Sequence, residues 1–130
     1  MKGESDPVTR KRSILVVDDE PGGLKVVAAT LRQQGFDVDT AMTGGQGLKL
    51  ALEEGYDLVL TDERMPGMTG TEMLRAIRER GVGCPVIVMT AYGGVASAVE
   101  AMRAGAYNYL TKLLNFEELI LLVQRAIEAH

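Results

Sequence analysis

The stretch that decides the fold reads Leu58-Val59-Leu60-Thr61-Asp62-Glu63-Arg64-Met65-Pro66-Gly67. Its first three residues are all apolar, which is typical of a parallel strand that helices cover on both faces. Pro66 and Gly67 then break the chain into a loop, so we expect Asp62 at the carboxyl end of the strand. Open α/β sheets bind their ligands at that edge.

Three other predicted strands also end on polar side chains. Asp18 and Asp19 follow residues 14–17, Thr90 follows residues 85–89, and Lys112 follows residues 107–111. Because the carboxyl ends of parallel strands meet at one edge of a sheet, we expect these side chains to lie close together.

Helical patterns separate the predicted strands. Apolar residues recur there at spacings of three and four, which indicates helices with one buried face. The predicted helices begin near Pro21, Thr43, Thr69, Val95 and Asn115. Gln46 and Glu72 stand three residues after Thr43 and Thr69, as in a capping box. With a further strand at residues 36–41, five strands alternate with five helices, which predicts an α/β fold whose parallel sheet carries helices on both faces.

The length of 130 residues fits one domain with its own core. Residues 1–12 are polar and charged, so we expect a flexible leader there and a single domain at residues 13–130. The leader contains the basic triplet Arg10-Lys11-Arg12. Three charges beside a terminus favour solubility over a nucleic-acid arm.

Composition excludes several classes of function. Lys and Arg number 14 against 18 Asp and Glu, a net charge of −4, so we expect no direct binding of nucleic acid. Cys84 is the only cysteine, which excludes an intrachain disulfide, and we expect it to be buried before a strand. The only histidine is His130, the last residue, so the domain has no base for a histidine metal site or a Ser-His-Asp triad. No apolar run has the length of a membrane span, and residues 1–12 lack a signal peptide's apolar segment, so we expect a cytoplasmic protein without membrane contact.

The predicted cluster of Asp18, Asp19 and Asp62 is crowded with negative charge. Such carboxylates raise one another's pKa unless a cation relieves them, and an all-oxygen site suits Mg²⁺. One carboxylate could attack a phosphoryl group while Lys112 and Thr90 stabilise its oxygens. Each residue alone is often a turn former, a helix cap or a surface lysine. Their joint occurrence at four strand ends favours the chemical interpretation.

The chain resembles the receiver domains of response regulators in bacterial two-component signalling. The residues that carry the resemblance are Val16-Val17-Asp18-Asp19-Glu20, Thr61-Asp62-Glu63-Arg64-Met65-Pro66-Gly67-Met68-Thr69-Gly70, Val88-Met89-Thr90-Ala91 and Gly105-Ala106-Tyr107-Asn108-Tyr109-Leu110-Thr111-Lys112. They extend the resemblance from residue 13 to about residue 129. The resemblance implies a flavodoxin-like, doubly wound sheet of five parallel strands in the order 2-1-3-4-5, with five helices.

The resemblance also implies a phosphorylation site that depends on Mg²⁺. Asp62 would be the phosphoacceptor, and the histidine of a sensor kinase would be the donor. Asp19, Asp62 and the backbone carbonyl of Arg64 would bind Mg²⁺ directly, and Asp18 would act largely through water.

Further residues acquire roles by the same resemblance. Lys112 and Thr90 would contact phosphoryl oxygens, while Thr90 and Tyr109 would act as the switch. Arg64 and Tyr92 are candidates for setting the lifetime of the phosphoryl group. The switch would remodel the surface formed by residues 95–104, 107–110 and 115–127, which could pair as a homodimer.

One departure from the family pattern follows Lys112. That lysine is usually followed by proline, often through a cis peptide bond, whereas Leu113 stands here. Because a cis bond before a non-proline residue costs about 2.5–4 kcal/mol, we expect a trans bond at Leu113 and a shifted loop. The change puts the efficiency of switching in question more than the fold.

The favoured function is a signalling module that catalyses only its own phosphorylation and dephosphorylation. It resembles the receivers at the front of enhancer-binding transcriptional activators, which implies an output in transcription regulation. The sequence leaves open whether the chain is a fragment of such an activator or a receiver that stands alone. A receiver that has lost control by phosphorylation is also conceivable.

Two other classes of protein share parts of this pattern. A phosphatase or phosphotransferase with an aspartyl intermediate usually has a second acid or base two residues after the nucleophile, where this chain has Arg64. A flavin-binding electron carrier needs a phosphate-binding loop after its first strand, and Asp18-Asp19-Glu20 would repel a phosphate there.

Overall fold

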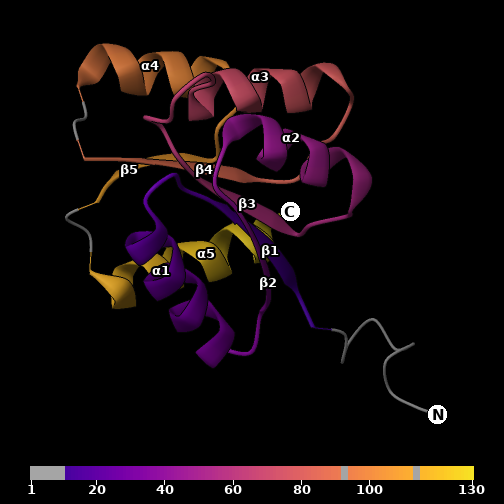
Figure 1. Cartoon of the computed structure of the whole chain (residues 1–130), viewed down its shortest axis with the longest axis vertical. Helices are drawn as coiled ribbons and strands as arrows, with labels where there is room; N and C mark the ends of the chain where they lie inside the picture. The colour runs from indigo at the N-terminus through magenta and orange to yellow at the C-terminus, as the bar shows by residue number, and fades with distance from the viewer. Residues whose placement is uncertain (1–10, 92–93, 113–114) are drawn as a thin grey trace.

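The computed structural model describes residues 11–91, 94–112 and 115–130. In these parts of the chain five strands alternate with five helices, as the sequence predicts (Figure 1). The strands are β1 (Ser13–Val17), β2 (Asp37–Ala41), β3 (Leu58–Asp62), β4 (Val86–Thr90) and β5 (Asn108–Thr111). The helices are α1 (Pro21–Gln33), α2 (Gly44–Glu53), α3 (Gly70–Glu79), α4 (Val95–Arg103) and α5 (Phe116–Ala129).

The strands form one parallel sheet in the order β2-β1-β3-β4-β5, which confirms the flavodoxin-like prediction. The chain runs outward from β1 to β2 and then returns past β1 to β3. The loops after β1 and β3 therefore leave the sheet in opposite directions, which opens a crevice between them. Val17 lies beside Thr61, and Asp62 lies beside Met89, so the ends of β1, β3 and β4 are neighbours.

Helices cover the sheet on both faces. Figure 1 shows α1 and α5 on one face and α2, α3 and α4 on the other. Along β1, Ile14 and Val16 belong to the core shared with α1 and α5, whereas Leu15 and Val17 belong to the core shared with α2 and α3. Because successive side chains of a strand point to opposite faces, both faces need apolar residues. This explains the uninterrupted apolar runs in the sequence.

The helix starts largely follow the predicted caps. At α3 the complete capping box forms: the Thr69 hydroxyl accepts the Glu72 N–H at 3.0 Å, and the Glu72 carboxylate accepts the Thr69 N–H at 2.9 Å. At α2 the Thr43 hydroxyl accepts the Gln46 N–H at 3.1 Å. The Gln46 side chain reaches one residue further back and accepts the Met42 N–H at 3.1 Å, so only half of the predicted box forms there.

Three predictions fall on residues outside the described parts of the chain. They concern most of the expected leader, the side chain of Tyr92 and the peptide bond at Leu113. Among the described helices, none combines the length and the apolar character needed to cross a lipid bilayer.

Candidate functional site

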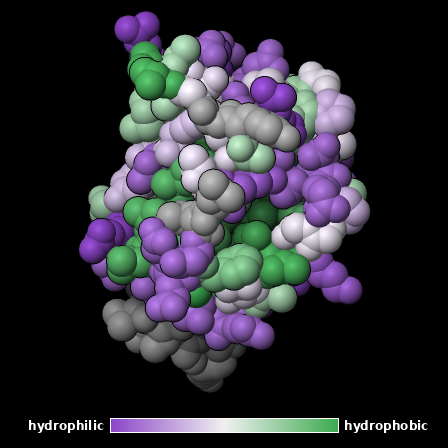
Figure 2. Space-filling view, turned by 90° about the vertical axis from the view of Figure 1, so that its left-hand side faces the viewer, coloured by the Kyte–Doolittle hydropathy of each residue, from purple (hydrophilic) through white to green (hydrophobic). Residues whose placement is uncertain are grey.

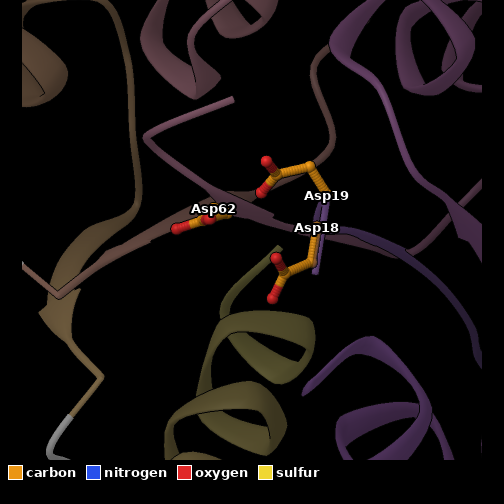
Figure 3. A group of neighbouring side chains, drawn as sticks. All are labelled: Asp18, Asp19 and Asp62. Carbon is orange, nitrogen blue, oxygen red and sulfur yellow. The ribbon is translucent and has the colours of Figure 1, made fainter. Parts of the chain in front are cut away.

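Three carboxylates meet at the carboxyl ends of β1 and β3. Asp18 and Asp19 directly follow β1, and Asp62 is the last residue of β3. One oxygen from each of them lies within 4.8 Å of the other two. Figure 3 shows the three side chains at adjacent strand ends, with Asp19 extending upward and Asp18 downward in this view and Asp62 between their levels. The sequence prediction that these side chains converge is confirmed.

The donor set of this cluster fits a hard divalent cation. All three groups are carboxylates, and Mg²⁺ prefers oxygen ligands and usually retains several water molecules. Asp18 and Asp62 are buried, whereas Asp19 is not, so the cluster stays open to water on one side. The cluster could therefore hold an ion that keeps part of its hydration shell.

Lys112 supplies a positive charge to the two buried carboxylates. Its Nζ lies 3.2 Å from an oxygen of Asp62 and 3.3 Å from an oxygen of Asp18. Burial alone would lower the pKa of Lys112, but the carboxylates of Asp62 and Asp18 outweigh it and raise that pKa. The lysine reaches the site although Leu113 takes the place of the usual proline.

The carboxyl group of Asp62 is difficult to ionise. Burial raises its pKa, and the charges of Asp18 and Asp19 raise it further, against the opposing influence of Lys112. The ionised form of Asp62 therefore costs free energy in the folded protein. A bound cation would reduce that cost.

Asp18 is held in place by the start of α1. Its Oδ1 accepts the backbone N–H of Glu20 at 3.0 Å, while its Oδ2 faces Lys112. Glu20 is the N-cap of α1, and its carboxylate accepts the N–H of Gly23. This role of Glu20 was not predicted from the sequence. The sequence pattern of a carboxylate side chain directly before a proline could have predicted an N-cap here, because proline is common at the first position of a helix.

Helix α3 packs directly on the backbone of Asp62, the last residue of β3. A side-chain carbon at Gly70, the first residue of α3, would lie 2.5 Å from the carbonyl oxygen of Asp62. That separation is too short for any real contact, so the close approach requires glycine at this position. This contact was not predicted from the sequence, because Gly70 also fits an ordinary loop before a helix.

The predicted switch residues lie on β4, which pairs with β3, and on β5, which pairs with β4. Thr90 ends β4 and is buried, and its carbonyl accepts the backbone N–H of Lys112 at 2.8 Å. Tyr109 on β5 is half-buried and packs against the core beneath α2, α3 and α4. Arg64 is exposed in the loop after β3.

A mainly apolar pocket opens beside the carboxylates. It has a volume of about 220 Å³ and lies between α1 and the start of α5. Val27, Met89, Phe116 and Leu119 line it, and Asp18 and Lys112 form its polar wall. Figure 2 views this side of the molecule, where hydrophobic surface borders a recess among polar residues.

Comparisons with known proteins agree with this geometry. Residues 14–124 match the family described as response regulator receiver domain. The chain is 40% identical over 121 residues to the regulatory protein AtoC of Escherichia coli, and the match covers 93% of this chain. It is 41% identical over 114 residues to the transcriptional regulatory protein ZraR of Escherichia coli, covering 88% of this chain. Each match covers only 26% of the relative, so the chain spans about a quarter of these proteins.

A solved structure gives the same result for the fold. The beryllofluoride-activated NtrC4 receiver domain dimer superposes with a TM-score of 0.84 at 33% sequence identity. The match covers 90% of this chain and 97% of that chain.

Proposed function

Because the chain belongs to the response regulator receiver family, we propose that it accepts a phosphoryl group on Asp62 from a phosphohistidine of a sensor kinase. It is a receiver domain and not an enzyme of the phosphatase or phosphotransferase class. The observation that carries the proposal is the cluster of Asp18, Asp19 and Asp62 with Lys112 bound to two of its members.

The transfer exchanges one phosphorus bond for another. A carboxylate oxygen of Asp62 attacks the phosphorus, the bond from phosphorus to the imidazole nitrogen breaks, and the imidazole leaves with its electron pair. Lys112 and the Thr90 hydroxyl contact phosphoryl oxygens and stabilise their charge. Asp19, Asp62 and the backbone carbonyl of Arg64 would hold Mg²⁺, with Asp18 acting through water. When bound, Mg²⁺ neutralises negative charge on the carboxylates and the phosphoryl group.

The phosphorylated form changes the surface made by α4, β5 and α5. Thr90 moves toward the phosphoryl group and Tyr109 follows it, which shifts the population between two arrangements of that surface. The attachment of α4 supports this role. Ala101 is the only buried residue of α4. The ion pair between Arg75 of α3 and Glu100 of α4 is 3.4 Å long and exposed.

Arg64 and Tyr92 set the lifetime of the phosphoryl group.

The same surface forms a homodimer after phosphorylation. Val95, Val99 and Met102 stand on one stripe of α4 and are 83%, 43% and 48% exposed. A similar receiver has been solved as an activated dimer. Light scattering should show a monomer that dimerises on treatment with beryllofluoride, and Val99→Glu should prevent it. A monomer under both conditions would contradict the dimer.

The output of the receiver is regulation of transcription in the cytoplasm. AtoC and ZraR, which are similar to this chain over most of its length, are named as regulatory proteins. With a net charge of −4 the chain has no surplus of basic residues to neutralise DNA phosphates, so another domain or protein supplies that contact.

The proposal is tested by intact mass after incubation with acetyl phosphate and Mg²⁺. We expect one phosphoryl increment that hydroxylamine removes, and none in Asp62→Ala or with a chelator in place of Mg²⁺. No increment in folded protein that binds Mg²⁺ would contradict phosphorylation of this chain. A Leu113→Pro variant that then becomes phosphorylated would assign the defect to the loop after Lys112.

A further inference from the structure

The residue directly after the proposed acceptor, Glu63, is bound to the start of α3. Its Oε1 accepts the backbone N–H of Thr71 at 2.7 Å and the hydroxyl of Thr71 at 2.8 Å. Its backbone carbonyl accepts the N–H of Gly70 at 3.0 Å. Glu63 therefore satisfies the first two N–H groups of a helix whose next N–H is capped by Thr69.

Three features keep the hydrogen bonds between Glu63 and Thr71 in place. Thr71 is only 2% exposed, so its hydroxyl depends on Glu63 for a partner within the protein. Hydrogen bonds to a charged carboxylate are stronger than those between neutral groups. The backbone N–H of Glu63 donates to the carbonyl of Met89 at 2.7 Å, which fixes Glu63 to β4 as well.

Together these bonds close the loop at residues 64–69. One end is attached to β4 through Glu63, the other is the start of α3, and the contact from Glu63 to Thr71 ties the two ends together. Arg64 is the first residue inside this closed loop. Glu63 directly precedes Arg64, so its bonds to β4 and to the start of α3 hold the chain at the point where this loop begins.

We propose that Glu63 and Thr71 are a positioning pair for the divalent cation, because they hold the loop in which the Arg64 carbonyl serves as a ligand. The inference rests on the proposed function, in which that carbonyl binds Mg²⁺. A ligand held in place before binding needs no ordering when the ion arrives, so the pair raises affinity without touching the ion.

The experiment compares the dissociation constant of Mg²⁺, by isothermal titration calorimetry, with the free energy of unfolding in urea. Thr71→Val removes the hydroxyl but keeps a similar shape and the charge of Glu63, whereas Thr71→Ser keeps the hydroxyl. Ile77→Val is the matched control, because it creates a small defect in the buried face of the same helix, away from the loop.

We expect Thr71→Val to weaken Mg²⁺ binding roughly tenfold, the lower end of the range for residues that support metal ligands. Thr71→Ser should bind like the wild type, and Ile77→Val should lose stability but no affinity. Wild-type affinity in Thr71→Val, with only a loss of stability, would overturn the inference and leave the pair as a helix cap.

Glu63→Gln is a second variant, which tests the positioning role of the pair even if Thr71→Val fails to fold. Its weaker binding should persist in high salt, where long-range effects of the lost charge are screened. If both single variants fold, the double variant should lose less affinity than the sum of the two, because both break one contact. A salt-sensitive loss or an additive double variant would contradict the pair.

Mg²⁺ binding by the wild type and by Asp19→Asn distinguishes a failure of this inference from a failure of the proposed function. If the wild type binds no Mg²⁺, or Asp19→Asn binds it unchanged, the proposed metal site fails and the inference fails with it. If both behave as expected and Thr71→Val binds normally, only the inference fails.

Discussion

Asp62 is buried, lies near the carboxylates of Asp18 and Asp19, and has Lys112 as a cationic partner. Its ionised carboxyl group therefore lowers the free energy of unfolding. Because its pKa is raised in the folded protein, the native state keeps its proton to higher pH than the unfolded chain. Stability is therefore lost as pH rises from the unfolded pKa through the folded pKa, and above the folded pKa the ionised group destabilises the fold.

Replacing Asp62 by asparagine should therefore stabilise the protein in the absence of divalent ions. We expect the melting temperature of Asp62→Asn to exceed that of the wild type by a few degrees at pH 7. The difference should shrink as pH falls and Asp62 takes up its proton. Circular dichroism during heating, with a chelator present, measures it. Mg²⁺ should raise the melting temperature of the wild type more than that of the variant. A less stable variant at pH 7 would contradict this account.

Lys112 pairs with Asp18 and Asp62, two of the three carboxylates whose charge a bound cation would neutralise. Removing its charge in Lys112→Met should tighten Mg²⁺ binding severalfold, because the cation no longer competes with the ammonium group. Phosphorylation should nevertheless slow, since the phosphoryl oxygens lose a positive partner.

Calorimetry gives the affinity of this variant, and intact mass over time gives the rate of phosphorylation. Lys49→Met, at an exposed position of α2, is the control and should change neither quantity. Weaker Mg²⁺ binding in Lys112→Met would show that the lysine supports the cation site.

At the scale of elements, α3 packs closely against β3, the strand that ends at Asp62. A methyl group at Gly70 would lie 2.5 Å from the carbonyl oxygen of Asp62, so Gly70→Ala must push the helix away. We expect a loss of about 1–3 kcal/mol in the free energy of unfolding, as for other overpacked sites. Mg²⁺ affinity should fall as well, because the loop after Asp62 moves with the helix.

Gly45→Ala is the matched control for this prediction. Gly45 lies in α2 with no atom near the position of an added methyl group. Because alanine favours helix over glycine by up to about 1 kcal/mol, this variant should be more stable than the wild type. Urea unfolding measures both variants. Equal stability of Gly70→Ala and the wild type would mean that α3 does not fix Asp62.

The elements could be predicted where a physical constraint repeats along the chain. A strand buried on both faces needs an uninterrupted apolar run, and Leu58 to Leu60 already show one. A polar residue at the end of such a run lies at the sheet edge, so Asp18, Asp19, Asp62 and Lys112 could be brought together from sequence.

Contacts that depend on the path of a single loop could not be predicted. Glu63 reaches Thr71, and Gly70 touches the backbone of Asp62, only because of how the chain turns between β3 and α3. The Gln46 side chain caps Met42 instead of Thr43 for a similar reason, since its reach depends on the local backbone. No spacing rule contains this information.

At the scale of the molecule, the carboxylates and the apolar pocket lie next to each other at the carboxyl ends of the strands. Phe116 is 43% exposed at the pocket, next to Asp18 and Lys112, where a partner protein would approach Asp62. We expect Phe116→Asp to slow phosphorylation by a purified sensor kinase at least tenfold. Phosphorylation by acetyl phosphate should be unchanged, because the small donor does not need the pocket surface.

Leu121→Asp tests whether this effect is specific to the pocket. Leu121 lies on the same helix, is 46% exposed and does not line the pocket, so transfer from the kinase should stay normal. Radiolabel transfer from the kinase follows both variants. Equal losses with kinase and acetyl phosphate in Phe116→Asp would indicate damage to the site itself.

The most direct test of the central claim is to locate the phosphoryl group on the chain. Borohydride reduces an aspartyl phosphate to homoserine, so phosphorylated protein can be reduced, digested and sequenced by tandem mass spectrometry. We predict homoserine at position 62 only, and none when Mg²⁺ is withheld. Homoserine at Asp18, Asp19 or another residue, or none in a sample whose mass shows the phosphoryl group, would contradict Asp62 as the acceptor.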